Sequence, residues 1–202
     1  MNHLMLWSTA ILLLLGTTHP DSGKLQSFKD QRDGKEYKVT RIGKLAIMAE
    51  NLAYEVDDAY CYQNESHFCQ HYGKLYDYQT AVGDEKGGAV RGICPQGWHI
   101  PSEEEWLYIL SGLRGKATAK RNNYISFLVP NNLLRMRFSG FKSHQENRFY
   151  QLGQRGFYMA SGTKDGLWTA VEIKRNGEKD FMALHSKTPI KRAISCRCIQ
   201  DY

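Results

Sequence analysis

The length, composition and charge of the chain are those of an ordinary globular protein. Its 202 residues suit one domain, and its 24% charged and 42% hydrophobic residues are close to average. These totals exclude a polytopic membrane protein, a collagen and a wholly disordered chain. The net charge of +6 divides unevenly, with −5 over residues 1–110 and +11 over residues 111–202. A basic second half favours an anionic partner, although a solvated basic surface has the same composition.

The first apolar segment, Leu4–Leu15, is typical of a secretory signal peptide. Its 12 residues are too few to cross a membrane, which takes about 20 residues in a helix. Small residues follow, and cleavage after Thr18 would place Gly16 and Thr18 at the small-residue positions. We therefore predict a signal peptide over residues 1–18 and export to the periplasm, cell surface or extracellular space, with an uncleaved N-terminal anchor as the alternative. No cysteine lies near the cleavage region, so we do not expect a lipoprotein.

The five cysteines are expected to form disulfides in an exported protein. Cys61 and Cys69 would close a short loop. Cys94 joined to either C-terminal cysteine, Cys196 or Cys198, would close a loop of about 100 residues and stabilise the fold by roughly 4–5 kcal/mol. Because the number is odd, at least one thiol stays unpaired or pairs between chains.

Two metal sites are the alternatives to these disulfides. A copper or redox site could involve Cys196 and Cys198, which point the same way on an expected strand. A zinc site could use His67, Cys69 and His71, which alternate and would therefore share one face of an extended strand. The spacing of these ligands fits no standard zinc pattern, and export favours the disulfide. The zinc candidates are Cys61, His67, Cys69 and His71. We predict no metal and no cofactor.

A linker followed by two strands is expected at the start of the mature chain. Residues 19–32 are polar and are predicted to form the N-terminal linker. The turn signal Asp33-Gly34 is followed by a predicted strand over Lys35–Ile42, and a second strand is expected over Leu45–Met48. Residues 54–72 are expected to form a loop held by two of the cysteines.

The clearest helical signal follows Pro101. Ser102 and Glu105 form a capping box, in which the Ser102 hydroxyl accepts from a first-turn amide and the Glu105 carboxylate accepts from the Ser102 amide. Apolar residues then recur with the spacing of one helical face. These residues are Trp106, Ile109, Leu110 and Leu113. A second, short helix is expected over Leu75–Ala81.

The second half is expected to consist of short strands between turns. Asn176-Gly177, between two apolar runs, is a strong hairpin signal. The fold class is therefore α+β, with one or two helices. The expected strands are Ile125–Val129, Met136–Phe138, Phe149–Leu152, Phe157–Ala160, Leu167–Ile173, Lys179–His185 and Ala193–Ile199.

A series of short motifs runs through the chain. They are Asp33-Gly34-Lys35-x-Tyr37, Ile42-Gly43, Met48-Ala49-Glu50-Asn51-Leu52, Tyr72-Gly73-x-Leu75-Tyr76, Cys94-Pro95-x-Gly97-Trp98-His99-Ile100-Pro101-Ser102, Glu105-Trp106 and Ser195-x-Arg197-Cys198-Ile199-x-Asp201. In this order and at these spacings they resemble the Fibrobacter succinogenes major paralogous domain family, over nearly the whole mature chain. The stretch from Trp98 to Trp106 is also similar to a segment of formylglycine-generating enzymes and other C-type-lectin-like domains.

This resemblance implies a C-type-lectin-like single domain over residues 33–202. Such a domain has two helices, a twisted antiparallel sheet and chain ends that meet. Members of the family are bacterial and are exported or surface-associated. The disulfides that the resemblance implies are Cys94–Cys198 and Cys61–Cys69, with Cys196 left as a free thiol.

The sequence favours a binding module over an enzyme. It contains no nucleophile elbow, zinc-protease motif, phosphate loop or dinucleotide fingerprint, and it lacks the calcium-ligand triplets of C-type lectins. We therefore expect no catalytic residue. The alternative is an enzyme related to formylglycine-generating enzymes, in which Cys196 would be a reactive thiol of low pKa. Nucleic acid is not expected as a partner, because export separates the chain from it.

The basic second half is the expected binding surface. Its cations are interleaved with aromatic residues, which suggests a surface for an acidic glycan, an envelope lipid head group or an envelope protein. The alternative is that the aromatic side chains are core and the bases are solvated. Trp168 is predicted to be the exposed tryptophan, Trp98 and Trp106 are expected in the core, and His99 is expected to be structural. The ligand-binding candidates are Arg135, Arg137, Lys142, Arg148, Arg155 and Trp168.

Overall fold

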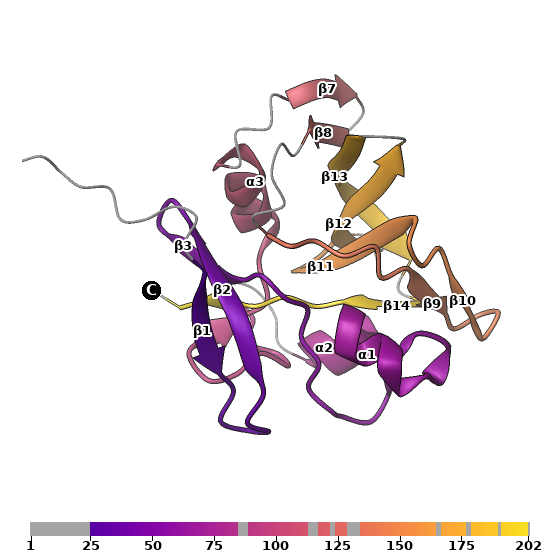
Figure 1. Cartoon of the computed structure of the whole chain (residues 1–202). Helices are drawn as coiled ribbons and strands as arrows, with labels where there is room; N and C mark the ends of the chain where they lie inside the picture. Colours follow the sequence, from indigo (N-terminus) through magenta and orange to yellow (C-terminus); the bar gives the residue numbers. More distant parts are fainter. Residues whose placement is uncertain are drawn as a thin grey trace, which may run out of the picture.

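The computed structural model describes most of the domain predicted from the sequence (Figure 1). The predicted signal peptide lies outside the described residues. Among the helices of the described residues, none combines the length and the apolar character that a membrane span requires. The described residues are 25–84, 89–112, 117–121, 124–128, 134–164, 167–176, 179–189 and 191–201.

The described residues form an α+β fold of short helices and two sheets. The helices are η1, a 3-10 turn (Tyr62–Asn64), α1 (Ser66–Tyr72), α2 (Tyr78–Val82) and α3 (Glu103–Gly112). The smaller sheet contains β1 (Gln26–Lys29), β2 (Glu36–Ile42), β3 (Leu45–Met48), β6 (Trp98–His99) and β15 (Ile199–Gln200). The larger sheet contains β4 (Ala59–Tyr60), β5 (Leu75–Tyr76), β7 (Ala117–Arg121), β8 (Tyr124–Leu128), β9 (Phe141–Ser143), β10 (Arg148–Tyr150), β11 (Arg155–Lys164), β12 (Leu167–Asn176), β13 (Lys179–Pro189) and β14 (Arg192–Ser195).

The smaller sheet joins the two ends of the domain. Its strands lie in the order β1-β2-β3-β15-β6, so the C-terminal strand is inserted beside the N-terminal strands. Ile199 of β15 pairs with Ile47 of β3 on one side and with His99 of β6 on the other. The first and last strands therefore share one sheet, in agreement with the expectation that the chain ends meet.

Strand β1 places the start of the domain before the expected boundary at Asp33. Gln26–Lys29 pairs antiparallel with Glu36–Val39 of β2, although these residues were expected in a linker. Asp30, directly after the strand, is fully buried, and its carboxylate lies 2.7 Å from the Arg32 guanidinium. Only one side chain of β1 is half-buried and the others are exposed, so no apolar alternation marks the strand in the sequence.

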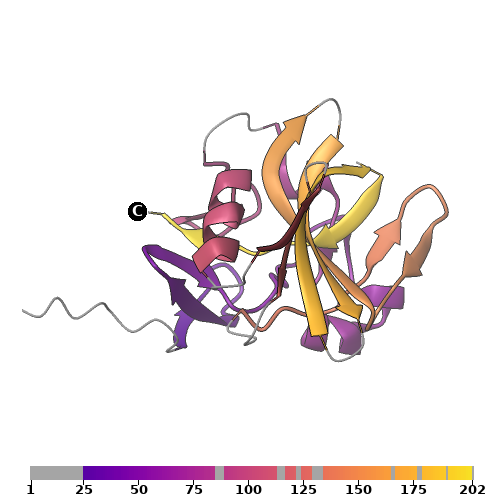
Figure 2. The same ribbon diagram turned by 90° about the horizontal axis from the view of Figure 1, so that it is seen from above.

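The larger sheet is twisted and mainly antiparallel (Figure 2). Its strands lie in the order β10-β9-β14-β11-β12-β13-β8-β7, and β5 and β4 attach to β14. Strands β12 and β13 form the hairpin predicted at Asn176-Gly177, because Asn176 pairs with Lys179. Strand β14 pairs with β11 in parallel and the chain then continues into β15. The C-terminal segment therefore connects the two sheets.

Helix α3 begins and packs as its sequence predicts. The Glu105 carboxylate accepts from the Ser102 amide at 2.9 Å, and the Ser102 hydroxyl accepts from the Glu105 amide at 3.2 Å. The inner face of the helix packs in one apolar cluster with residues of β3 and β12. Its buried residues are Trp106, Ile109 and Leu110, whereas Leu113 lies outside the described residues.

Helices α1 and α2 differ from their predictions. Helix α1 lies in the segment expected to be a loop, and it has no buried residue, so its sequence shows no apolar periodicity. The helix ends at Gly73, where φ is 71°. Helix α2 begins three residues later than expected, because Asp77 caps it by accepting from the Thr80 amide at 2.7 Å.

Two disulfides stabilise the fold, as the family resemblance implied. Cys61 pairs with Cys69 beside α1, and Cys94 pairs with Cys198 between the segments that precede β6 and β15. Cys196 is free and buried. The Cys61–Cys69 bond uses two of the four residues of the alternative zinc site.

Trp168 is buried, so the prediction of an exposed tryptophan is wrong. Its exposed fraction is 0%, and its ring packs edge-to-face on Tyr78 with centroids 5.1 Å apart. Residues 168–173 are buried on both alternating faces of β12. Because neighbouring parts of the fold cover both faces of this strand, the turn signal that precedes Trp168 does not indicate exposure. Trp98 and Trp106 are buried, as expected.

Candidate functional site

A groove of about 660 Å³, lined mainly by polar and charged residue types, opens beside helix α1. Its size falls in the range of roughly 300–1,000 Å³ that small-molecule sites occupy. The groove is lined by the start of β2, the stretch that follows β3, helix α1 with the residues after it, and the segment that precedes β9. Lining side chains that matter below are Lys35, Glu50, Asn51, Gln70, Arg135 and Arg137.

Asn51 and Arg197 connect three walls of the groove through one hydrogen-bond network. Arg197 Nε donates to Asn51 Oδ1 at 2.8 Å, although the two residues lie 146 positions apart. Asn51 Nδ2 donates to the carbonyl of Tyr72 at 2.7 Å and to Ser195 Oγ at 3.1 Å. Both side chains are buried, where an unpaired polar group would be costly. The network therefore fixes α1 and the C-terminal segment to the groove floor.

The segment that carries Arg135 and Arg137 is held by buried side chains. Arg197 Nη1 donates to the Leu134 carbonyl, and Nη2 donates to the Arg135 carbonyl at 3.0 Å. The Tyr158 hydroxyl donates to the Arg137 carbonyl and accepts from the Arg137 amide, each at 2.6 Å. The backbone beneath the two arginines is therefore fixed, and the Arg137 side chain is exposed.

The same contacts correct one predicted strand, because Met136–Phe138 forms no strand. Met136 and Phe138 are buried, so the apolar alternation of the sequence correctly marks their burial. The Arg137 amide and carbonyl bond to the Tyr158 hydroxyl, and the Phe138 carbonyl accepts from the amide of Gly153, which lies in no strand. Arg135 also has a φ of 46°, which lies outside the range of a β-strand.

Gly73 allows helix α1 to approach Asn51 closely. Its φ of 71° lies in the left-handed region that favours glycine. A Cβ atom at this position would lie 2.6 Å from Asn51 Cβ and 2.9 Å from the Leu52 carbonyl oxygen. A larger residue would therefore push the end of α1 away from the groove floor.

The charges of the groove are mostly paired. Glu50 Oε1 lies 3.3 Å from Arg135 Nη1, and Glu55 Oε1 lies 2.6 Å from Lys74 Nζ. Each pair has a partly exposed member, so solvent weakens both pairs. Among the described residues, the Arg137 guanidinium has no ion-pair partner. The groove therefore presents one guanidinium that is available to an anion.

The β2 side of the groove supplies hydrogen-bonding groups. Lys35 Nζ lies 3.3 Å from Asp33 Oδ2 and also donates to the Ala53 carbonyl. The Tyr37 hydroxyl accepts from the Ala53 amide at 3.1 Å. Burial raises the pKa of Tyr37 to about 12. This hydroxyl is therefore neutral at physiological pH and acts in hydrogen bonding.

The residues just described fall within a known domain family. The family model of the Fibrobacter succinogenes major domain matches residues 30–200. The chain belongs to this family. No curated protein and no solved structure matches the chain. The C-type-lectin-like fold that the resemblance implies therefore stays a prediction.

Motifs of the Fibrobacter succinogenes major domain meet at the groove. Three motifs line it directly, and Arg197 of the closing motif holds its floor from behind. The sequence identified these motifs but not their meeting point, because Asn51 and Arg197 are far apart in the chain. The lining residues that come from the motifs are Lys35, Tyr37, Glu50, Asn51 and Gly73.

Only two of the predicted basic candidates line this groove. Arg135 and Arg137 line the groove, whereas Lys142, Arg148 and Arg155 do not. The aromatic residues between them are largely core, since Phe138, Phe141 and Phe157 are buried. The part of the basic half that can bind a ligand in the groove is therefore limited to two arginines.

The other three basic candidates have separate surroundings. Lys142 is buried, with Nζ 3.6 Å from the centroid of the Tyr60 ring. Arg155 Nη1 lies 2.7 Å from Glu172 Oε1. Arg148 is exposed on β10. Lys142 and Arg155 already have partners, so their positive charges are less available to a ligand.

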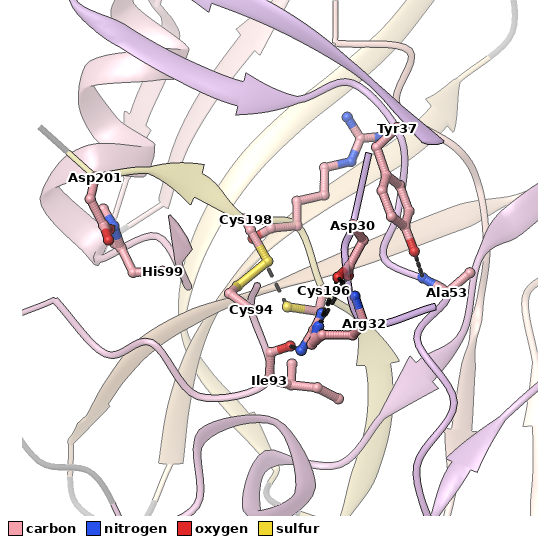
Figure 3. Close-up of a disulfide and its surroundings, with 11 residues drawn as sticks. Asp30, Arg32, Tyr37, Ala53, Ile93, Cys94, His99, Cys196, Cys198 and Asp201 are labelled. Atoms are coloured by element: carbon pink, nitrogen blue, oxygen red, sulfur yellow. Dashed lines mark hydrogen bonds and ion pairs between the residues drawn. A yellow bond between two sulfur atoms is a disulfide. The ribbon is translucent and has the colours of Figure 1, made fainter. Parts of the chain in front are cut away.

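Cys196 lies beside the Cys94–Cys198 disulfide (Figure 3). The sulfur atoms of the three cysteines lie within 4.8 Å of one another, and all three residues are buried. Burial raises the pKa of the Cys196 thiol to about 12. A thiol in this state is a poor nucleophile and a poor metal ligand, because both roles require the thiolate.

His99 bridges two carboxylates, one on each side of its ring. Nδ1 lies 2.6 Å from Asp201 Oδ1, and Nε2 lies 3.0 Å from Glu105 Oε1. The ring is buried between β15 and α3. Both nitrogens of His99 are thus engaged within the fold, which fits the structural role expected from the sequence.

Proposed function

We propose that this chain is an exported, non-catalytic binding module of the bacterial cell envelope, and that it binds an anionic ligand in the groove beside α1. The ligand classes compatible with the sequence are an acidic glycan, an envelope lipid head group and an envelope protein. The observation that carries the proposal is the meeting of three family motifs with Arg135 and Arg137 in one groove.

The mixed charges of the groove support binding rather than nonspecific adhesion. The Glu50–Arg135 pair is partly exposed, so an anionic ligand can compete for Arg135 at little cost. Arg137 adds a guanidinium whose fork geometry suits carboxylate, sulfate or phosphate oxygens. Two neighbouring guanidinium groups on a fixed backbone would hold such a ligand in one orientation.

The enzyme alternative has less support. It requires a reactive thiol at Cys196, whereas that thiol is buried and its pKa is raised to about 12. The neighbouring Cys198 is held in a disulfide. Neither cysteine lines the groove, so a reaction on a ligand bound there would lack this nucleophile.

Retention on immobilised envelope components tests the proposal. We expect the exported chain to be retained at low salt by an acidic glycan, by anionic vesicles or by an envelope protein fraction, and to elute as salt screens the charges. The double variant Arg135→Gln/Arg137→Gln should lose this retention. The matched variant Arg148→Gln/Lys191→Gln, which removes two exposed charges outside the groove, should keep it.

Two results would contradict the proposal. Equal loss of retention in both double variants would mean that net charge, and not the groove, causes binding. If none of these components retained the wild-type chain at low salt, the groove would have no role in anion binding.

A further inference from the structure

The groove contains none of the exposed large apolar side chains of the described residues. Those side chains are Leu25 and Tyr108, at 43% and 40% exposure, and neither lines the groove. The cores of protein interfaces are rich in large apolar and aromatic side chains, and membrane-bound surfaces insert apolar side chains. A ligand made of hydroxyl and charged groups therefore suits this lining better than a protein surface or a lipid layer.

Polar side chains from two walls of the groove supply both donors and acceptors. Ser66 and Gln70 stand on α1, and Glu36 stands at the start of β2. All three are exposed. A hydroxyl, an amide and a carboxylate together can donate to and accept from neighbouring hydroxyl groups of a ligand. This combination is what a saccharide ring with several hydroxyls requires.

Arg137 provides the charge recognition in this groove. Its backbone is fixed by the Tyr158 hydroxyl, which bonds both the Arg137 amide and the Arg137 carbonyl. Its side chain is exposed and, among the described residues, lacks an ion-pair partner. A guanidinium on a fixed backbone is suited to bidentate binding of a planar carboxylate.

We propose that the groove binds a uronate unit of an acidic polysaccharide. The carboxylate of the unit lies on the Arg137 guanidinium, and its ring hydroxyls contact the polar side chains of β2 and α1. This inference rests on the proposed binding function, and it selects the acidic glycan among the three ligand classes.

Calorimetric titration with oligogalacturonate tests the inference. The wild-type chain should bind, and Arg137→Gln should weaken binding about tenfold or more, the effect of losing a charge-assisted hydrogen bond. Arg137→Lys should give an intermediate affinity, because lysine keeps the charge and loses the fork. Arg148→Gln, which removes an exposed charge outside the groove, should bind as the wild type does.

The neutral methyl ester of the same oligomer separates charge recognition from ring recognition. It should bind at least about tenfold more weakly than the acid, if the carboxylate contacts Arg137. Equal affinity for ester and acid would overturn the inference, and so would equal weakening by Arg137→Gln and Arg148→Gln. Unchanged melting temperatures of the variants confirm that they are folded.

Parallel retention on anionic vesicles and on immobilised polyglutamate distinguishes this inference from the proposed function. If oligogalacturonate does not bind while either probe is retained through Arg135 and Arg137, the binding module stands and the saccharide assignment is wrong. If no probe depends on these two arginines, the inference and the proposed function both fail.

Discussion

Arg197 is a buried positive charge that is stabilised by hydrogen bonds to several oxygen atoms. The guanidinium donates to Asn51 Oδ1 and to the carbonyls of Met48, Leu134 and Arg135. Burial lowers the pKa of Arg197 from its usual value, yet a guanidinium in a protein stays protonated. Because these oxygens come from distant segments, the residue joins them and supports the groove at the same time.

Replacement of Arg197 should strongly destabilise the domain. Arg197→Met leaves Asn51 Oδ1 and several carbonyls without a donor, and the expected loss in free energy of unfolding is about 3–5 kcal/mol. Arg197→Lys keeps the charge and some donors, so it should lose less. Guanidinium chloride unfolding measures both losses. The control Arg148→Met, at an exposed position, should stay within about 0.5 kcal/mol of the wild type, and a similar value for Arg197→Met would contradict this account.

Cys196 should be chemically inert in the folded protein. The residue is fully buried, and burial raises the pKa of its thiol to about 12, so almost no thiolate exists at neutral pH. We expect a maleimide to label the native chain only as it unfolds. In denaturant without reductant, the chain should take one label. More than one label would contradict the disulfide pairing, and rapid native labelling would favour the enzyme alternative.

At the scale of elements, His99 on β6 ties helix α3 to the C-terminal segment. The hydrogen bond to Glu105 and the one to Asp201 raise the pKa of His99, against the opposing effect of burial. Burial by itself would raise the pKa of Glu105, but hydrogen bonds from His99 and Ser102 hold this pKa below its usual value. The charged pair is therefore favoured in the folded state.

The pH dependence of stability follows from these two shifts. His99 contributes fully to the free energy of unfolding below its unfolded pKa of about 6.5, and this contribution is lost as pH rises through its pKa in the folded state. Glu105 contributes fully above its unfolded pKa of 4.5, and its contribution is lost as pH falls through its pKa in the folded state. The pair should therefore stabilise the domain most between about pH 4.5 and 6.5.

Glu105→Gln tests this window, because glutamine preserves the capping box and removes the charge. We expect the melting temperature to fall most, relative to the wild type, near pH 6, and the deficit to shrink in alkaline solution. The control Glu104→Gln changes a neighbouring exposed carboxylate on the same helix and should show no such pH dependence. A Glu105→Gln deficit that is the same at every pH would contradict the charged pair.

Elements with local signals could be predicted from the sequence, and contacts between distant segments could not. Helix α3 was predictable because its capping box and its apolar face lie within one short stretch. Helix α1 was not predictable, because none of its residues is buried and its sequence therefore has no apolar face to recognise. The groove depends on Asn51 meeting Arg197 across 146 positions, which no local spacing encodes. Only the family motifs pointed to Asn51 and Arg197. They did not predict that the two side chains are in contact.

For the domain as a whole, the uneven charge of the sequence does not gather in the groove. The second half carries a net +11. Its predicted cations are nevertheless divided among a groove, an aromatic contact at Lys142 and an ion pair at Arg155. Salt should therefore weaken ligand binding mainly through the two groove arginines, and much less through the remaining net charge.

The two disulfides should stabilise the domain unequally, because they close loops of very different length. The separation is 8 residues for Cys61–Cys69 and 104 residues for Cys94–Cys198. In the chain-entropy model these loops correspond to roughly 2–3 and 4–5 kcal/mol. Urea unfolding of Cys94→Ala/Cys198→Ala should therefore show the larger loss, and Cys61→Ala/Cys69→Ala the smaller one. Cys196→Ala removes a buried sulfur beside the Cys94–Cys198 bond without removing a cross-link, so it measures the packing part of the loss at that bond. If the short loop proved the more stabilising, packing around α1 rather than chain entropy would set the contribution of the disulfides.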